Sequence, residues 1–408
     1  MQLKSGSNIQ DVKSQNRMLV LKHIATNHGI SRVDIARSTG LSKMTVGNIV
    51  TELSSANLIE ESETIQPLTN YGRRPIMLTL SQNSPCICGI LIKRKLCQII
   101  LSDLGGKIFF QQDYIYDSLY SSDDLLDIIW NLFSQCKKNL NRRILAIGIS
   151  SVGPVDSSKG IILRPPYFYG IENLPIASII EEETGIPSFL VNDATAGAFA
   201  EKLFGLGQTI PNFAYLHIMN GIGAGFILNH MLYDGDSGQS GEIGHTSINF
   251  QGPHCACGNK GCLDLYANVD TMRQRILELA PFYPESPLGK ETIPSWKDII
   301  TCGNQHDALA VNVLEEFCSY ISYSLTNTIN LLNLSTIIVG YASNHNGTII
   351  ETLLQNKLQL LSMTAKYHPL SILHSSFDGD APLVGSVALI ADKVFNGQLP
   401  LKELNNLN

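Results

Sequence analysis

Near the N-terminus, apolar and polar residues alternate with the period of an α-helix. One stretch keeps apolar residues at positions i, i+3, i+4 and i+7, namely Val46, Ile49, Val50 and Leu53. This spacing predicts a helix with a single buried stripe. Gly40 ends the preceding helix, because glycine enters the left-handed C-cap conformation easily, and Ser42 can cap the new one. An earlier helix with Met18, Leu21 and Ile24 facing inward completes a helix-turn-helix pattern.

The other face of the second helix carries small and polar side chains that suit a DNA major groove. The residues expected to contact DNA are Ser42, Lys43, Met44, Thr45, Gly47, Asn48 and Thr51. Two short strands around a turn follow, with Arg73 and Arg74 near the tip. This order predicts a winged helix whose wing arginines contact phosphates or the minor groove. A small three-helix protein-interaction domain is the alternative.

After this head, the pattern changes to apolar, β-rich runs that alternate with helical segments. The runs expected to form strands are 86–92, 96–103, 108–116, 144–150, 187–193, 213–229 and 335–340. The segments expected to form helices are 123–140, 194–205 and 315–333. Alternation of this kind predicts an α/β fold in layers.

Chain length and composition indicate the number of domains and the cellular compartment. A chain of 408 residues is too long for one ordinary core, so two or three domains are expected. Residues 1–80 have a net charge of +3 and the remainder −10, which favours the head as the DNA-binding part but decides nothing alone. No apolar run reaches the roughly 18 residues of a spanning helix, and the start lacks a signal-peptide pattern, so we expect a cytoplasmic protein.

One histidine and three cysteines form a tight motif of the spacing His-x9-Cys-x-Cys-x4-Cys. They are His245, Cys255, Cys257 and Cys262. Zinc prefers four tetrahedral N and S ligands, and four protein ligands leave no position for a reactive water. The motif therefore predicts a structural Zn²⁺ site. His254 is a rival nitrogen ligand, and reduced cysteines without metal are the alternative.

Several motifs in a fixed order carry a resemblance to a known family. After the winged helix come "GRRP", "IGISSVGPVD", "VNDATAGAFAE", "NGIGAGFILN", "GEIGH" and "CACGNKGCLDLYA". Together they resemble the ROK family of bacterial sugar kinases and sugar-responsive transcriptional repressors, over essentially the whole chain. The resemblance implies an actin-like ATPase body of two α/β lobes with a sugar between them. It also implies a zinc site and dimers or tetramers.

The resemblance divides the chain into domains. Residues 1–82 would form the winged helix-turn-helix domain, and residues 83–408 the sugar-sensing ROK body. The first lobe of the body would span about 83–195 plus the C-terminal segment from about 383. The second lobe would span about 196–382 and carry the zinc loop.

The resemblance also implies a sugar site. The residues that match sugar-contacting positions of the family are Asn192, Asp193, Glu242, His245 and Asp264, with Gly153 shaping a loop over the sugar. The zinc-bound histidine would serve both sites. The family usually has Glu where this chain has Asp264, so that contact is displaced, lost or bridged by water.

The nucleotide positions depart from the kinase pattern. Kinases of the family begin the body with Asp-x-Gly-Gly-Thr, which holds magnesium and cradles phosphate. This chain instead has Leu91, Lys93, Arg94 and Lys95 at those positions, Met219 and Asn220 in a second phosphate loop, and Tyr341 in the adenosine loop. We therefore predict no catalytic residue, although Asp193 retains the position of the kinase base.

The sequence as a whole predicts a repressor that binds operator DNA as a homodimer or tetramer and responds to a sugar or sugar phosphate without phosphorylating it. A sugar kinase with an accessory DNA-binding head is the enzymatic alternative. A repressor controlled by a protein of a transport system is a third possibility. The basic turn at 93–95 is a solvated hairpin tip or, as a minor option, a site for a phosphorylated sugar.

Overall fold

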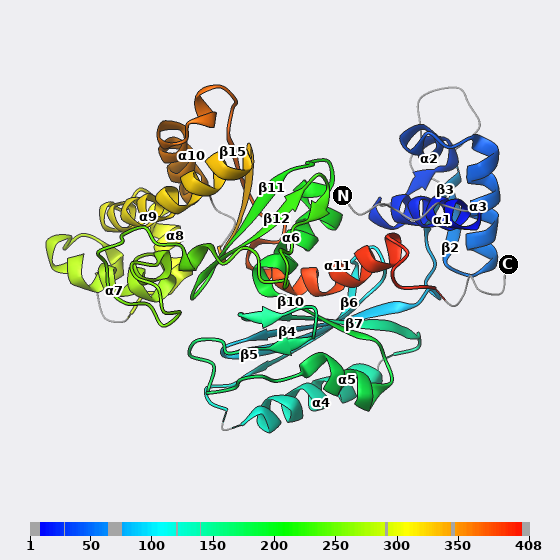
Figure 1. Ribbon diagram of the computed structural model, residues 1–408, viewed down its shortest axis with the longest axis horizontal. Helices are drawn as coiled ribbons and strands as arrows, with labels where there is room; N and C mark the ends of the chain where they lie inside the picture. Colours follow the sequence, from blue (N-terminus) through cyan, green and yellow to red (C-terminus); the bar gives the residue numbers. More distant parts are fainter. Residues whose placement is uncertain are drawn as a thin grey trace. The chain divides into compact units, whose positions relative to one another are not determined.

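A computed structural model describes most of the chain as two compact units (Figure 1). The described residues are 9–27, 29–63, 76–119, 121–138, 140–289, 293–343 and 347–401. The first unit comprises residues 1–149, 175–189 and 386–408, and the second comprises residues 150–174 and 190–385. Arg73 and Arg74 of the predicted wing lie outside the described residues. The domain and lobe limits given above remain predictions.

The first unit begins with a helix-turn-helix and a small sheet. Its elements are α1 (Ile9–Thr26), β1 (Ile30–Ser31), α2 (Arg32–Thr39), α3 (Lys43–Ser55), β2 (Ile59–Glu63) and β3 (Ile76–Leu80). The strand order is β1-β3-β2. The strands β2 and β3 pair antiparallel from Ile59 opposite Leu80 to Glu63 opposite Ile76. The two strands expected around the wing are thus present.

The caps of α2 and α3 explain why the turn falls where it does. Gly40 ends α2 with a φ of 72°, a left-handed conformation that glycine adopts without steric cost. The Ser42 hydroxyl accepts a hydrogen bond from the Thr45 backbone N–H at 3.0 Å and so starts α3. The four apolar residues of the predicted stripe are all buried, which confirms the helical pattern.

A charged contact fixes α3 on α1. Arg17 is buried, and its guanidinium lies 2.9 Å (Nε) and 2.8 Å (Nη2) from the Glu52 carboxylate on α3. Lys13, also on α1, lies 3.0 Å from the other oxygen of Glu52. Both Arg17 nitrogens approach the same Glu52 oxygen, and only the Nε donates a hydrogen bond to it. Because Arg17 is buried, this ion pair restrains orientation more than an exposed pair does.

A five-stranded sheet forms the rest of the first unit, in the order β10-β7-β4-β5-β6. Its elements are β4 (Cys86–Lys93), β5 (Leu96–Ser102), β6 (Ile108–Ile115), α4 (Ser122–Lys138), β7 (Ile144–Ser151), α5 (Ile176–Thr184), β10 (Ser188–Asn192) and α11 (Ala381–Phe395). The helices α4 and α5 cover one face (Figure 1). A Cβ at Gly148 would lie 1.9 Å from the Ser386 carbonyl oxygen, so glycine lets α11 approach β7 closely.

The second unit is built on another five-stranded sheet, in the order β13-β12-β11-β14-β15. Its strands are β8 (Val155–Asp156), β9 (Ile161–Ile162), β11 (Phe213–Ile218), β12 (Ile222–Leu228), β13 (Met231–Leu232), β14 (Thr336–Gly340) and β15 (Ser371–His374). β8 and β9 pair separately, while β11, β14 and β15 run parallel in the main sheet. The run predicted at 213–229 is the antiparallel β11–β12 hairpin.

Helices pack against this sheet and form a hydrophobic core with it. They are α6 (Asp193–Phe204), α7 (Val269–Leu279), α8 (Trp296–Asn304), α9 (Ala308–Leu332) and α10 (Ile349–Leu361). Short 3₁₀ helices are η1 (Leu206–Gln208), η2 (Ile243–His245), η3 (Leu263–Leu265), η4 (Ala280–Phe282), η5 (Pro287–Gly289), η6 (Thr364–Lys366) and η7 (Asp378–Asp380). The predicted α/β layering is confirmed in both units.

A polar cluster joins the ends of β14 and β15 to α10 and η7. The two ring nitrogens of His374 lie 2.7 Å from a Glu351 oxygen and 3.2 Å from an Asp378 oxygen. The buried Tyr341 donates to the second Glu351 oxygen at 3.0 Å. The hydrogen bond to Glu351 raises the pKa of His374, with the charges of Glu351 and Asp378 adding to it and burial opposing it.

This cluster predicts a pH-dependent contribution to stability. Because the folded-state pKa of His374 is raised, its stabilisation is present below the ordinary value of about 6.5 and is lost as pH rises through the raised value. His374→Gln should therefore lower the melting temperature clearly at about pH 6 and much less at about pH 9. Thermal unfolding at both pH values measures this, and a difference that grew with pH would contradict the assignment.

Candidate metal and sugar site

The loop from His245 to Cys262 folds back on itself through backbone hydrogen bonds. The Cys255 N–H donates to the Asn259 carbonyl at 2.8 Å, and the Ile248 N–H donates to the Gly261 carbonyl at 2.9 Å. Gly261 has a φ of 61°, and a Cβ there would lie 1.7 Å from the Asn249 carbonyl oxygen. Glycine is therefore required at this position for the loop to close.

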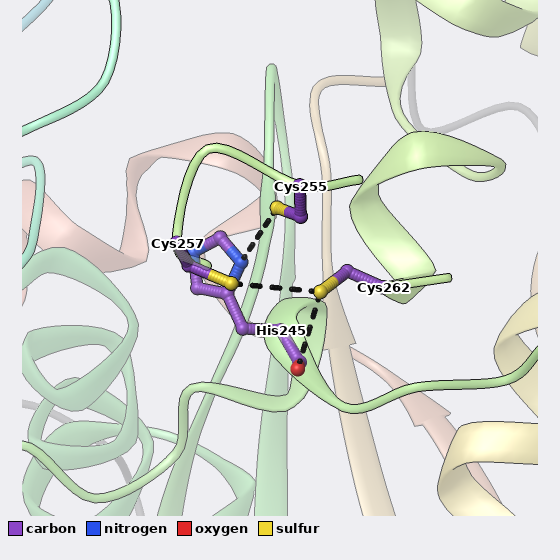
Figure 2. Close-up of side chains that lie close together, drawn as sticks. All are labelled: His245, Cys255, Cys257 and Cys262. Carbon is purple, nitrogen blue, oxygen red and sulfur yellow. Dashed lines mark hydrogen bonds between the residues drawn. The ribbon is translucent and has the colours of Figure 1, made fainter. Parts of the chain in front are cut away.

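This closure brings the four predicted ligands together (Figure 2). Their ligand atoms all lie within 4.8 Å of one another. The His245 Nδ1 is 3.7 Å from the Cys255 Sγ, and the Cys257 Sγ is 3.6 Å from the Cys262 Sγ. His254 is exposed and does not belong to the group, so the rival nitrogen ligand is not favoured.

Two of the distances between these atoms suit a tetrahedral zinc site. Zn–S bonds of about 2.3 Å and Zn–N bonds of about 2.1 Å place ligand atoms roughly 3.6–3.8 Å apart in a tetrahedron. Both distances above fall in or at the edge of this range. Three thiolates and one imidazole are also the ligand types that zinc selects. The cluster can hold a metal ion with no open coordination position.

Removing one ligand should test the metal site. Cys257 is exposed, so Cys257→Ser changes little packing and chiefly removes a thiolate. We expect zinc content to fall well below one per chain and stability to drop by about 2 kcal/mol or more, roughly 4–8 °C in melting temperature for a unit of this size. Elemental analysis and thermal unfolding measure the two effects. His254→Ala should change neither; wild-type protein without stoichiometric zinc would reject the site.

Two of the predicted sugar residues stand at the start of α6. The Asn192 Oδ1 accepts from the Ala194 N–H at 2.9 Å and caps the helix. The Asp193 Oδ1 accepts from the same N–H at 2.8 Å. The helix N-terminus favours the negative charge of Asp193. The strand-to-helix junction therefore fixes both side chains.

Glu242 faces two other carboxylates of the second unit. Its side chain keeps an exposed surface, but surrounding protein atoms withdraw its carboxyl group from water. This desolvation, followed by the charges of Asp193 and Asp264, raises the pKa of Glu242 to about 7. A Cβ at Gly153 would lie 2.3 Å from the Asn192 Nδ2 and 3.7 Å from the Glu242 Oε1. The residues predicted for sugar binding thus gather in one place.

The structure adds a role for Asp264 that its type alone did not suggest. The Asp264 Oδ1 accepts a hydrogen bond from the Ile222 N–H, at the start of β12, at 2.9 Å. The sequence offered one signal for this, namely Asp where the resembled family usually has Glu. The shorter side chain keeps its carboxylate near its own backbone.

Two of the predicted nucleotide positions carry buried side chains. Leu91 is fully buried within β4, which ends at Lys93, and the turn that follows holds Arg94 and Lys95. Tyr341 is also fully buried and is bonded to Glu351. Neither leucine nor a packed tyrosine supplies the oxygen ligands or the space that a magnesium–nucleotide complex requires.

The face of α3 predicted to contact DNA is open to solvent. Ser42, Lys43, Asn48 and Thr51 are exposed, and Met44 is 76% exposed. Thr45 and Gly47 are partly buried. The Ser42 hydroxyl also serves the helix cap, which fixes its position at the tip of α3.

Comparison with known proteins shows the family. A sequence model of the ROK family matches residues 88–393. The chain is 31% identical over 387 residues to the xylose repressor of Bacillus subtilis (strain 168), covering 93% of this chain and 96% of that protein. It is 27% identical over 406 residues to the DNA-binding transcriptional repressor Mlc of Escherichia coli (strain K12), covering 97% of each. The chain belongs to the ROK family.

Solved structures agree with this assignment. A ROK family transcriptional regulator, a homologue of Escherichia coli Mlc, superposes with a TM-score of 0.78 at 30% identity, covering 96% of this chain and 99% of that one. A ROK family glucokinase from Streptomyces griseus has a TM-score of 0.66 at 24% identity and covers 74% of this chain and 98% of its own. The predicted winged helix-turn-helix with an actin-like ROK body is confirmed. No helix among the described residues is long and apolar enough to cross a membrane.

Proposed function

We propose that this protein is a sugar-responsive transcriptional repressor that binds operator DNA through α3 and senses a sugar with the second unit. One observation carries the proposal. The side chains at the sugar-side positions lie close together, whereas two of the nucleotide-side positions, Leu91 and Tyr341, carry fully buried side chains. Similarity over nearly the whole chain to proteins named as repressors supports it.

The chemistry of the gathered residues suits a polyol. Asn192 can donate through its Nδ2, while Asp193 and Glu242 offer carboxylate oxygens that accept from hydroxyls. With the His245 Nδ1 turned to the cysteines, the Nε2 is the nitrogen left for a sugar. Relatives are named for xylose and for N-acetylglucosamine, so aldoses of these two kinds are the first candidates.

Binding is proposed to occur without phosphoryl transfer. Asp193 stands at the position of the kinase base, which would accept the proton of a sugar hydroxyl, but phosphoryl transfer also needs a bound nucleotide and its metal ion. Leu91 and Tyr341 are buried where those groups would have to be held. The alternative of an active sugar kinase therefore lacks the phosphate half of its site.

Regulation follows from linkage between the two ligands. A sugar changes DNA affinity only if it binds the DNA-competent and DNA-incompetent states with different affinity. Zn²⁺ is proposed as a structural ion that fixes His245 for this task. A homodimer or tetramer would present recognition helices to two half-sites one or two turns of DNA apart.

Sugar binding should depend on Asp193 and not on ATP. A panel of D-xylose, N-acetyl-D-glucosamine, D-glucose and their phosphates should contain a ligand that raises the melting temperature, since about 100 times Kd adds about 2.7 kcal/mol of stability. Asp193→Ala should weaken that ligand about 5- to 150-fold, because unpaired hydroxyls cost about 1–3 kcal/mol. Calorimetric titration measures the affinity.

Two controls accompany this experiment. Glu315→Ala removes an exposed carboxylate on α9 and should leave the affinity unchanged. Wild-type protein with the binding sugar should hydrolyse no ATP above background. ATP-dependent turnover that disappears in Asp193→Ala would replace the repressor proposal with the kinase alternative.

Different residues of α3 should contribute to overall DNA affinity and to sequence preference. With an operator selected from random DNA, Lys43→Ala should weaken binding and reduce the slope of log K against log salt by about 1, as expected for one phosphate contact. Asn48→Ala should alter sequence preference more than affinity. Lys107→Ala, an exposed lysine before β6, is the matched control. Unchanged operator binding by both α3 variants would show that α3 does not lie in the groove.

A further inference from the structure

The turn between β11 and β12 is held by residues that follow the zinc loop. The Ile222 N–H, at the end of this turn, donates to the Asp264 Oδ1 at 2.9 Å. The Asn220 Nδ2 donates to an Asp270 oxygen at 3.2 Å, at the exposed start of α7. The contact to Asp264 is partly buried, whereas the contact to Asp270 is exposed.

The Asp264 carboxylate also touches the segment that carries the first metal ligand. A Cβ at Gly244 would lie 2.5 Å from the Asp264 Oδ1, so only glycine beside His245 leaves room for this carboxylate. On the other side, a Cβ at Gly221 would lie 3.4 Å from the Asp264 Oδ2. One carboxylate thus lies among η2, η3 and the β11–β12 turn.

Both segments that surround the Asp264 carboxylate, η2 and η3, adjoin or contain a candidate metal ligand. His245 is the last residue of η2, and Cys262 directly precedes η3. The Leu263 N–H donates to the Thr246 carbonyl at 3.0 Å, which ties the two segments together. A metal ion held by His245 and Cys262 would therefore fix the position of the Asp264 backbone.

The β11–β12 turn borders the predicted sugar site. The Ala224 N–H of β12 donates to the Gly241 carbonyl at 2.9 Å, directly before Glu242. A Cβ at Gly223 would lie 2.9 Å from the Cβ of Ala194, directly after Asp193. The position of the β12 start is therefore linked to the backbone beside both carboxylates.

We infer that Asp264 is a positioning residue that fastens the β11–β12 turn to the zinc loop, so that metal binding orders the edge of the sugar site. One oxygen of its carboxylate accepts a hydrogen bond from the Ile222 N–H. The family-typical glutamate is one methylene longer, so to keep the same bond its carboxylate would have to be placed differently beside Gly244. This inference deepens the proposed function and rests on it for the sugar, but not for the contact itself.

Hydrogen exchange on the full-length, zinc-loaded protein tests the contact without sugar or DNA. Asp264→Ala should speed exchange in peptides covering residues 219–224 about fivefold, the factor that corresponds to about 1 kcal/mol for a lost hydrogen bond. Asp264→Asn keeps an Oδ1 acceptor and should restore protection. Asp270→Ala, which removes the exposed contact to the same turn, should have little effect.

The link to the metal is tested by repeating the measurement after chelation. Zinc removal should speed hydrogen exchange at 219–224 in the wild type. In Asp264→Ala it should speed exchange little further, because the hydrogen bond that holds the turn is already missing. Zinc content and circular dichroism confirm that each variant is loaded and folded. Wild-type protection in Asp264→Ala, or an unchanged turn after chelation of the wild type, would overturn the inference.

These outcomes are distinct from failure of the proposed function. If no sugar of the panel binds the wild type, the exchange experiment still decides the role of Asp264. If D-xylose binds, Asp264→Asn should retain its affinity while Asp264→Ala loses several-fold. A loss of D-xylose affinity in both variants with normal exchange at 219–224 would identify Asp264 as a direct sugar ligand instead.

Discussion

The convergence of four ligand atoms in the His245–Cys262 loop is the constraint on which the candidate site depends. Between η2 and η3 this loop has no helix or long strand to define its path, only short bridges and turns. Gathering its two ends within 4.8 Å fixes η2 and η3 relative to each other. Glu242 precedes one end and Asp264 follows the other, so the same closure places both carboxylates.

A second constraint is the close packing of α6 on the sheet of the second unit. A Cβ at Gly225 of β12 would lie 2.6 Å from the Ala198 Cβ, and one at Gly197 would lie 2.1 Å from the ring of Tyr215. Small residues on both surfaces let the helix backbone approach β11 and β12. This approach sets where the N-terminus of α6, with Asn192 and Asp193, meets the zinc-loop segment.

The residues at the predicted sugar positions and those at the predicted nucleotide positions have different surroundings. At the predicted sugar positions, desolvation, followed by the charges of Asp193 and Asp264, raises the pKa of Glu242 to about 7. On the nucleotide side, Leu91 joins a core strand and Tyr341 enters a hydrogen-bonded cluster with Glu351.

The sequence by itself determined the local elements and the candidate metal ligands. The period of the apolar residues placed α3, the caps placed its start, and the spacing of one His and three Cys identified the metal cluster. These signals lie within a few turns of chain or one short loop, where local geometry leaves few alternatives. The sugar and nucleotide positions were predicted only through a family resemblance, and they stay predictions.

Only the tertiary structure decided what Asp264 and His374 do. Asp264 bonds to Ile222, which is 42 residues away in sequence, and His374 bonds to Glu351 across two elements. A residue type states which bonds a side chain can make, whereas the fold brings a particular partner within hydrogen-bonding distance. For contacts between distant segments, the packing of sheet, helix and loop sets that distance, and no local pattern in the sequence records it.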